Sequence, residues 1–385
     1  MPPSLPTVYV PNELSKHLRR GHPWLYRDRL SKPVREPSGT WVQVRCGKFT
    51  GYGLWDKNSP IAVRLFSQNR VPDARWVSER IQDAWTARAA LREAGQTAYR
   101  WLYGAGDGLP GLVADLYNDY VVVETYADSL ESLLPWVVAG LRACMPLKGV
   151  LWKRGEVRSL WGRTPVRELV VEENGLRFYV DLLSGQKTGL FLDQRDNRAY
   201  LEQWCAGKRV INCFAYTGAF SLYAVRGGAR EVTSVDIAAP AVEAIGRNMA
   251  LNGYDEDAHP AIVADCFDLL EQYAKRGEQF DLVILDPPSL GRSRKHRRSA
   301  LRAYERLNRF ALECLSPGGL LATASCTSQV SPSDFTGMLG NAASRAGRRI
   351  RILHEAGHAL DHPVPAHFPE GRYLKFVVGS VQGVV

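Results

Sequence analysis

The spacing of hydrophobic and polar residues changes several times along the chain, and each change predicts a different kind of element. Within the first 72 residues, short segments of alternating apolar and polar residues are separated by turn-forming residues. This period of two is typical of half-buried strands, which we expect at 41–46, 49–55 and 61–66. From Pro72 to about Ala94 the apolar residues recur at helical spacing, and Gly95 is a typical helix stop. The pattern therefore predicts a small β-rich unit followed by a helix.

The next part of the chain mixes both periods and predicts an α+β unit. Strands are expected at 99–103, 112–117, 120–126 and 150–153, with a helix at 129–143. The glycine-dense segment 104–111 leads into a strand and not into a helix, so we expect turn geometry there and no phosphate cradle. Asn174-Gly175, between two β-prone segments, predicts a type I′ hairpin.

Beyond residue 184, predicted strands and helices alternate, which is typical of βαβ units and a mainly parallel sheet. The expected fold class is thus α/β for the C-terminal half, preceded by the β-rich and α+β units. We place the domain boundaries at 1–72, 73–183 and 184–385.

The stretch 209–223 predicts a strand, a tight turn and a helix N-terminus, which together present backbone N–H groups to a ligand. Asp236 ends the next predicted strand, where an acid can accept hydrogen bonds from ribose hydroxyls. The turn has a single glycine, so a nucleoside cofactor without a pyrophosphate fits best, and S-adenosylmethionine is the candidate. An ordinary strand–helix turn is the alternative. The predicted cofactor contacts of this turn are Asn212, Phe214, Tyr216, Thr217 and Gly218.

Two further acids follow predicted strands. Asp265 can place a carboxylate beside an adenine amino group, with Cys266 and Phe267 next to it and the phenyl ring as an apolar wall. A plain N-cap for the following helix would also explain Asp265. Asp286 precedes two prolines that hold the backbone extended, which fixes a carboxylate where open α/β sheets bind ligands. A structural end to the strand is the alternative for Asp286.

Cationic segments suggest contact with a polyanion. The loop after Asp286 could follow a phosphate backbone, although charge runs are often only solvated. Its predicted RNA contacts are Arg292, Arg294, Lys295, Arg297 and Arg298. Near the N-terminus, Lys16, Arg19 and Arg20 precede Trp24 and Tyr26, a mixture that could bind phosphates and stack on bases. A solvated helix end followed by a core tryptophan explains the second cluster equally well.

Cys326 closes an apolar predicted strand on the same sheet edge as Asp286. Carbon-5 of cytosine is too weak a nucleophile to take a methyl group unaided. Attack of a thiolate on C6 makes C5 enamine-like, and a basic, partly open crevice favours the thiolate. Asp286 could bind the N3/N4 edge of the ring. A buried structural thiol is the alternative for Cys326.

Composition adds limits to this picture. The 385 residues are 45% hydrophobic and 23% charged, typical of a soluble globular protein, and the net charge is +9. No apolar run reaches the roughly 18 residues of a membrane span, and the N-terminus does not resemble a signal peptide. The seven cysteines form no CxxC pair, which favours reduced thiols in the cytoplasm and no zinc site.

Several stretches in one order resemble the RlmI-like family of bacterial large-subunit rRNA cytosine-C5 methyltransferases. The matching stretches are 22–24, 107–115, 184–189, 192–198, 212–218, 285–288, 324–327 and 361–363. They extend over nearly the whole chain. One departure is Ser289-Leu290 after the Asp-Pro-Pro motif, where relatives often have an aromatic residue to stack on the base.

The resemblance implies an N-terminal PUA domain, a central α+β domain and a Rossmann-like class I methyltransferase domain that uses S-adenosylmethionine. It implies that Cys326 is the nucleophile and Asp286 the motif acid, and that 23S rRNA or an assembling large subunit is the partner. In such enzymes a segment lies over the cofactor pocket, and its matching residues are Gln186, Lys187, Thr188, Asp193, Gln194 and Arg195.

Two rival functions remain open at this point. A methyltransferase acting on a ring nitrogen, such as guanine N7, would use the same cofactor site without needing Cys326. A non-catalytic RNA-binding assembly factor could also be built on this fold, although it would not need the acids and the thiol. The sequence is compatible with a homodimer and does not decide the oligomeric state.

Overall fold

A computed structural model describes residues 5–166, 168–183, 189–291 and 294–382, and of Arg294 only the main chain. The chain divides into two units. One is Met1–Leu169 with Leu360–Gly371, and the other is Val170–Ala359 with Arg372–Val385. The division of the sequence into domains at 1–72, 73–183 and 184–385 stays a prediction.

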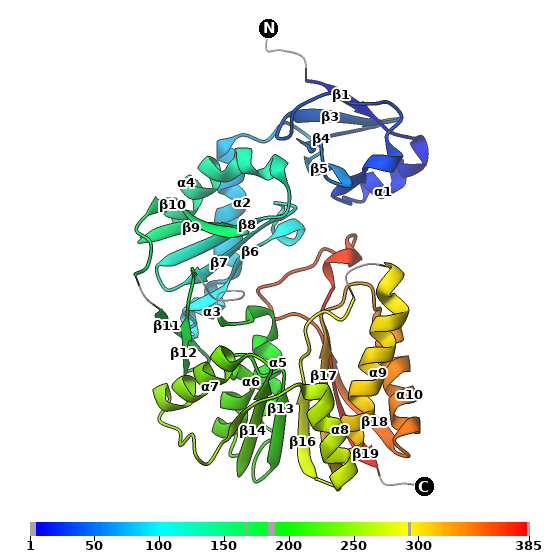
Figure 1. The fold of residues 1–385 in the computed structure, drawn as a ribbon. Coiled ribbons are helices and arrows are strands. Elements are labelled where there is room, and N and C mark those ends of the chain that lie inside the picture. Colours follow the sequence, from blue (N-terminus) through cyan, green and yellow to red (C-terminus); the bar gives the residue numbers. More distant parts are fainter. Residues whose placement is uncertain (1–4, 167, 184–188, 292–293, 383–385) are drawn as a thin grey trace. The chain divides into compact units, whose positions relative to one another are not determined.

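The first sheet confirms the three strands expected near the N-terminus and adds two short ones. Its order is β1-β3-β4-β5-β2, with β1 parallel to β3 and the other pairs antiparallel (Figure 1). The strands are β1 (Thr7–Tyr9), β2 (Trp24–Tyr26), β3 (Trp41–Cys46), β4 (Phe49–Trp55) and β5 (Ile61–Ser67). Alternate residues of β3, namely Val42, Val44 and Cys46, are buried, as the period of two predicts. The short helix α1 (Ser15–Arg19) precedes β2.

A second five-stranded sheet in the same unit has the order β10-β9-β8-β7-β6. Its strands are β6 (Ala98–Tyr103), β7 (Leu112–Tyr117), β8 (Tyr120–Thr125), β9 (Gly149–Arg154) and β10 (Glu156–Gly162). Between β6 and β7, Gly108 and Gly111 have positive φ angles of 76° and 87°. The glycine-dense segment therefore has the turn geometry expected from its sequence.

Two helix predictions for this unit need correction. The helix expected up to Ala94 is divided at Arg88 into α2 (Ala74–Ala87) and α3 (Ala89–Glu93), because Arg88 leaves helical geometry. The helix expected at 129–143 begins later, as α4 (Leu134–Cys144), after a 3₁₀ segment. Pro135 lies in the first turn of α4, where a missing N–H costs nothing.

The second unit contains a seven-stranded, mainly parallel sheet with the order β15-β14-β13-β16-β17-β19-β18. Its strands are β13 (Arg209–Cys213), β14 (Glu231–Asp236), β15 (Ala261–Val263), β16 (Phe280–Leu285), β17 (Leu315–Ser325), β18 (Arg349–Ala356) and β19 (Lys375–Gln382). Strand β19 runs antiparallel to both of its neighbours, β17 and β18. The strand order reverses between β13 and β16, and such switch points open a crevice at the carboxyl ends of the strands.

Helices cover both faces of this sheet (Figure 1). Along β13, Ile211 and Cys213 pack in the core beneath α8, α9 and α10, whereas Val210 packs in the core of α5 and α6. This alternation places an apolar core on each face, as expected of a buried parallel sheet. The helices are α5 (Arg195–Glu202), α6 (Ala219–Arg226), α7 (Ala239–Leu251), α8 (Cys266–Arg276), α9 (Arg297–Glu313) and α10 (Pro332–Arg345).

The hairpin of β11 (Leu169–Glu173) and β12 (Leu176–Val180) confirms the predicted type I′ turn. Asn174 and Gly175 both have positive φ, 50° and 78°, as this turn requires. Throughout the described residues, every helix is too short or too polar to cross a bilayer.

Candidate active site

The turn after β13 carries an unusual run of left-handed backbone. Phe214, Tyr216 and Gly218 have φ angles of 60°, 49° and 84°. Such conformations are costly for residues with a side chain and tend to occur at ligand sites. The Ala215 amide donates to the Val235 carbonyl at 2.9 Å, which ties the turn to the end of β14. The predicted cofactor turn is therefore a defined and strained structure at the switch point.

Asp236 lies beside this turn at the carboxyl end of β14. Its two carboxylate oxygens accept hydrogen bonds from the Tyr216 amide at 2.9 Å and the Ala238 amide at 3.0 Å. The carboxyl group remains partly exposed. It is thus oriented by the turn and can also accept hydrogen bonds from ribose hydroxyls.

Three predicted cofactor residues have side chains committed to the protein interior. The Asn212 amide donates to Ser221 Oγ at 2.9 Å, and Cys266 Sγ accepts from the Phe214 amide at 3.2 Å. Thr217 Oγ1 donates to the Gly189 carbonyl at 2.8 Å. These side chains hold the turn in place. Direct contact between them and a cofactor stays a prediction.

Asp265 caps α8, which confirms the alternative explanation for this acid. Its Oδ1 accepts from the amides of Phe267 at 2.8 Å and Asp268 at 3.3 Å. Phe267 stands edge-to-face against Phe214, with ring centroids 6.1 Å apart. The two rings form an apolar wall beside the turn. The predicted contact between Asp265 and adenine remains to be tested.

Asp286 is held by a buried amide network that the sequence pattern did not reveal. Gln194 Nε2 donates to Asp286 Oδ1 at 2.9 Å, and Asn197 Nδ2 donates to Gln194 Oε1 at 2.6 Å. Asn197 also donates to the Gly357 carbonyl at 3.0 Å. Gln194 is only 2% exposed. Gln194 therefore orients the motif acid, and its predicted contact with the cofactor stays a prediction.

Cys326 directly follows β17 and is partly exposed, whereas residues 319–325 of the strand are buried. Thr323 of β17 pairs with Leu285 of β16, so Cys326 and Asp286 lie at the same edge of the sheet. Thr327 Oγ1 forms hydrogen bonds with Tyr304 Oη at 2.9 Å and Ser289 Oγ at 3.2 Å, which anchors the residue after the thiol. All seven cysteines are described, and none forms a disulfide.

The predicted RNA contacts are only partly available for comparison. Arg292 lies outside the described residues, as does the side chain of Arg294. The predicted cofactor contact Thr188 also lies outside them, together with Gln186 and Lys187. Lys295, Arg297 and Arg298 are exposed at the start of α9. Arg297 is paired with Asp334 of α10 and holds the pKa of that carboxyl at about 2, so a phosphate would compete with this ion pair.

The N-terminal cluster has an exposed and a buried side. Lys16, Arg19 and Arg20 are exposed in and after α1. Trp24 is half-buried against Phe368, with ring centroids 4.6 Å apart. The tryptophan thus contributes to packing, as in the alternative explanation, and RNA binding by the three cations stays a prediction.

A buried ion pair in the second unit was missed at the sequence level. Arg198 donates to the Glu173 carboxylate through Nε and Nη2, at 2.7 to 2.9 Å. Its Nη1 donates to the Phe191 carbonyl at 2.9 Å. Tyr223 Oη donates to the same carboxylate at 2.9 Å. This cluster fixes the β11–β12 hairpin and the segment leading to Gln194. The ion-pair partner of Glu173 is 25 positions away in the sequence, so the residues around Glu173 give little local signal of the pair.

A second missed cluster lies in the first unit. Arg88, at the break between α2 and α3, binds the Asp107 carboxylate at 2.6 and 2.8 Å and the Asp361 carbonyl at 2.8 Å. Asp361 also accepts from the Arg100 amide at 2.8 Å. These bonds attach the segment Leu360–Gly371 to the first unit, which explains why that segment groups there.

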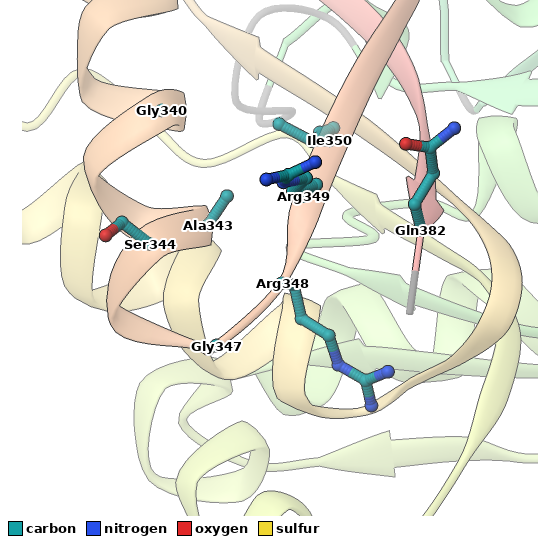
Figure 2. A pocket seen from close by; sticks show the side chains of 8 residues that line it. All are labelled: Gly340, Ala343, Ser344, Gly347, Arg348, Arg349, Ile350 and Gln382. Atoms are coloured by element: carbon teal, nitrogen blue, oxygen red, sulfur yellow. The ribbon is translucent and has the colours of Figure 1, made fainter. Parts of the chain in front are cut away.

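An open groove of about 600 Å³ lies elsewhere on the sheet, beside the end of α10 (Figure 2). Its lining residues are Gly340, Ala343, Ser344, Gly347, Arg348, Arg349, Ile350 and Gln382. Arg349 begins β18 and pairs with Gln382, at the amino ends of the parallel strands. The groove is therefore at the opposite edge from Asp286 and Cys326 and is not part of this site.

The described residues fit a nucleoside cofactor. The strained turn, the partly exposed Asp236 carboxylate and the Phe214–Phe267 wall lie together at the switch point. The Oδ1 atom of Asn212, directly below the turn, is buried without a hydrogen-bond partner in the described structure. No group of three or more histidine, cysteine or acidic residues in the described ranges could hold a metal ion.

Comparisons with known proteins agree with this geometry. Residues 150–355 match the family described as S-adenosylmethionine-dependent methyltransferase, and residues 8–68 match a PUA-like domain. A methyltransferase crystallised with SAH is 27% identical, with a TM-score of 0.89 over 98% of this chain and 100% of that chain. A SAM-dependent methyltransferase from Streptococcus mutans is 26% identical, with a TM-score of 0.88 over the same shares. The cofactor is therefore S-adenosylmethionine, and the fold is Rossmann-like with an N-terminal PUA-like domain.

Curated relatives are similar over nearly their full length. The protein named ribosomal RNA large subunit methyltransferase I of Aeromonas salmonicida is 35% identical, over 96% of this chain and 98% of its own. The protein of the same name from Shewanella denitrificans is 36% identical, over 95% and 97%. That from Vibrio cholerae is 35% identical, over 96% and 98%. The chain therefore belongs to the S-adenosylmethionine-dependent methyltransferases, in the family of ribosomal RNA large subunit methyltransferase I.

Proposed function

We propose that this protein methylates carbon-5 of a cytosine in 23S ribosomal RNA, with Cys326 as the nucleophile. The names of the relatives support large-subunit rRNA as the substrate. The position of Cys326 supports the carbon chemistry: a partly exposed thiol follows β17, beside the strand that ends at Asp286. A thiol buried in the core would have no such use.

The chemistry assigned to Cys326 is covalent. The thiolate adds to C6 of the cytosine, and the electron pair of the C5–C6 double bond moves toward C5 and the ring. When bound, S-adenosylmethionine supplies an electrophilic methyl group. After C5 carries the methyl group, loss of the C5 proton to a base restores the double bond and expels the sulfur as thiolate. The enzyme is thereby regenerated.

Asp286 is assigned the Watson–Crick edge of the base. A carboxylate there can bind the N3/N4 edge and share a proton at N3, which steadies charge on the ring during attack at C6. Gln194 donates to one carboxylate oxygen of Asp286 at 2.9 Å, and this bond orients the acid. Pro287 and Pro288 keep the chain extended directly after the acid.

The cofactor is assigned to the turn after β13 and its neighbours. Asp236 accepts hydrogen bonds from the ribose, and Asp265 lies by the adenine with Phe267 as an apolar wall. The remaining residues proposed for cofactor binding are Asn212, Phe214, Tyr216, Thr217, Gly218, Cys266, Asp286, Gln194 and Thr188.

RNA binding is assigned to two basic surfaces. The PUA-like domain would contribute Lys16, Arg19 and Arg20. The loop after Asp286 would contribute Lys295, Arg297 and Arg298 together with Arg292 and Arg294. A net charge of +9 is consistent with such a partner. Since the substrate is ribosomal, we expect the protein to work in the cytoplasm.

Mass-spectrometric mapping of rRNA methylation, with and without the protein, tests this function. We expect a single cytosine to gain a C5 methyl group with the wild type and with Cys144→Ala, which removes the other half-buried cysteine. Cys326→Ala should lose the product while its calorimetric affinity for S-adenosylmethionine stays within about twofold. Retained methylation by Cys326→Ala at a ring nitrogen would instead establish a nitrogen methyltransferase. Absence of both cofactor binding and product would favour a non-catalytic assembly factor.

A further inference from the structure

Lys375, the first residue of β19, is a buried cation in this site. Its side chain is 5% exposed, and lysine is rarely buried unless it is paired. Its Nζ donates to the carbonyls of Thr327 and Tyr373, each at 2.7 Å. These are its hydrogen bonds within the described part of the chain, and both acceptors are neutral. An ammonium has three N–H donors, so its charge and one donor remain uncompensated by these bonds.

The buried ammonium contacts the segment that carries Cys326. Lys375 pairs with Ser325 across the β17–β19 ladder, and its Nζ reaches the carbonyl of Thr327. The lysine therefore binds the residues on both sides of the thiol. Burial lowers the pKa of Lys375 to about 8, and a charged Cys326 sulfur raises it. The two groups thus interact electrostatically, and the ammonium remains the main form at neutral pH.

Other described titratable groups near this pair have partners of their own. Tyr304 of α9 reaches Thr327 through its hydroxyl, and burial raises the pKa of this phenol, so it stays neutral. The Tyr373 hydroxyl donates a hydrogen bond to the Asp193 carboxylate. Asp286, on the neighbouring strand, receives the amide of Gln194.

We propose that Lys375 is a positioning residue that holds Cys326 as a thiolate, so that a buried ammonium pairs with a partly exposed sulfur. The thiol proton leaves to water, the ammonium keeps its three protons, and the sulfur electron pair becomes available to C6 of the base. This assignment rests on the proposed function for its catalytic meaning, but the ion pair itself is a property of the protein without RNA. A cation within several ångströms of a thiol lowers the pKa of that thiol by about one unit or more.

The pH dependence of alkylation tests the pair directly. Folded protein is treated with iodoacetamide across a pH series, and labelling of Cys326 is measured by peptide mass spectrometry. We expect Lys375→Met to raise the midpoint for Cys326 by about one pH unit or more. Lys275→Met, which removes an exposed lysine on α8, should leave that midpoint unchanged. An unchanged midpoint in folded Lys375→Met would overturn the proposal.

A reciprocal measurement covers the case in which Lys375→Met does not fold. Removal of the thiolate by Cys326→Ala should lower the titration midpoint of Lys375 Nζ, followed by lysine-selective ¹³C–¹⁵N NMR. An unchanged lysine midpoint would contradict the pair. These outcomes are independent of rRNA methylation: if Cys326→Ala still methylates RNA, the proposed function fails, whereas the two titrations still decide whether the pair exists.

Discussion

At the scale of single residues, Asp236 gives the sharpest test of the cofactor site. Its carboxylate holds two amides of the strained turn and is assigned to the ribose. Loss of charge-assisted hydrogen bonds costs about 1.5–3 kcal/mol, which corresponds to roughly a 10- to 100-fold weaker binding. We expect Asp236→Asn to raise the Kd for S-adenosylmethionine by this factor in calorimetric titration. Asp268→Asn, an exposed acid in the first turn of α8, is the control. Equal affinities would remove Asp236 from the site.

Lys375 also makes stability depend on pH. Burial lowers its pKa to about 8, whereas an unfolded lysine titrates near 10.4. Between these values the unfolded chain binds more protons, so stability rises with pH across this window. Relative to Lys375→Met, the wild type should gain roughly 2 kcal/mol of unfolding free energy between pH 8 and pH 10.5. Urea denaturation at each pH measures this difference, and parallel curves would contradict it.

At the scale of elements, the buried Glu173–Arg198 pair connects the β11–β12 hairpin to the start of α5. Glu173 and Arg198 are 0% and 1% exposed. Removal of one partner leaves an uncompensated buried charge, which costs about 3–5 kcal/mol. We expect Glu173→Gln to lower the unfolding free energy by this amount in urea denaturation. The adjacent exposed Glu172→Gln is the matched control, and a loss similar to that of the control would argue against this role.

Among the elements, sequence patterns predicted two turns correctly but missed one helix break. The hairpin at Asn174-Gly175 and the turn at Gly218 were predicted, because the required positive φ angles are set by the residues themselves. The break at Arg88 was not predicted. Its guanidinium is bound by Asp107 and by Asp361, and the second of these contacts spans 273 positions. A helical pattern cannot report such a contact.

At the scale of the whole molecule, the net charge of +9 predicts salt-dependent binding to RNA. Each phosphate contact to single-stranded nucleic acid contributes about 0.7 to the slope of log affinity against log salt. We expect Lys295→Ala with Arg298→Ala to lower that slope by about 1.4 for a 23S rRNA fragment. Arg276→Ala with Lys275→Ala, on the far end of α8, should leave the slope unchanged. An equal slope in both variants would exclude the loop from the RNA interface.

The sequence by itself determined the α/β class, the tight turn after β13 and the order of Asp236, Asp265, Asp286 and Cys326 after the strands. Each of these depends on residues within a few positions, and parallel strands bring their carboxyl ends to one edge. Only the tertiary structure decided what supports the chemistry. Gln194 reaches Asp286 across 92 positions, and Lys375 reaches Thr327 across 48. Burial of an amide or an ammonium beside a reactive group arises from packing between distant segments, and no local pattern encodes it.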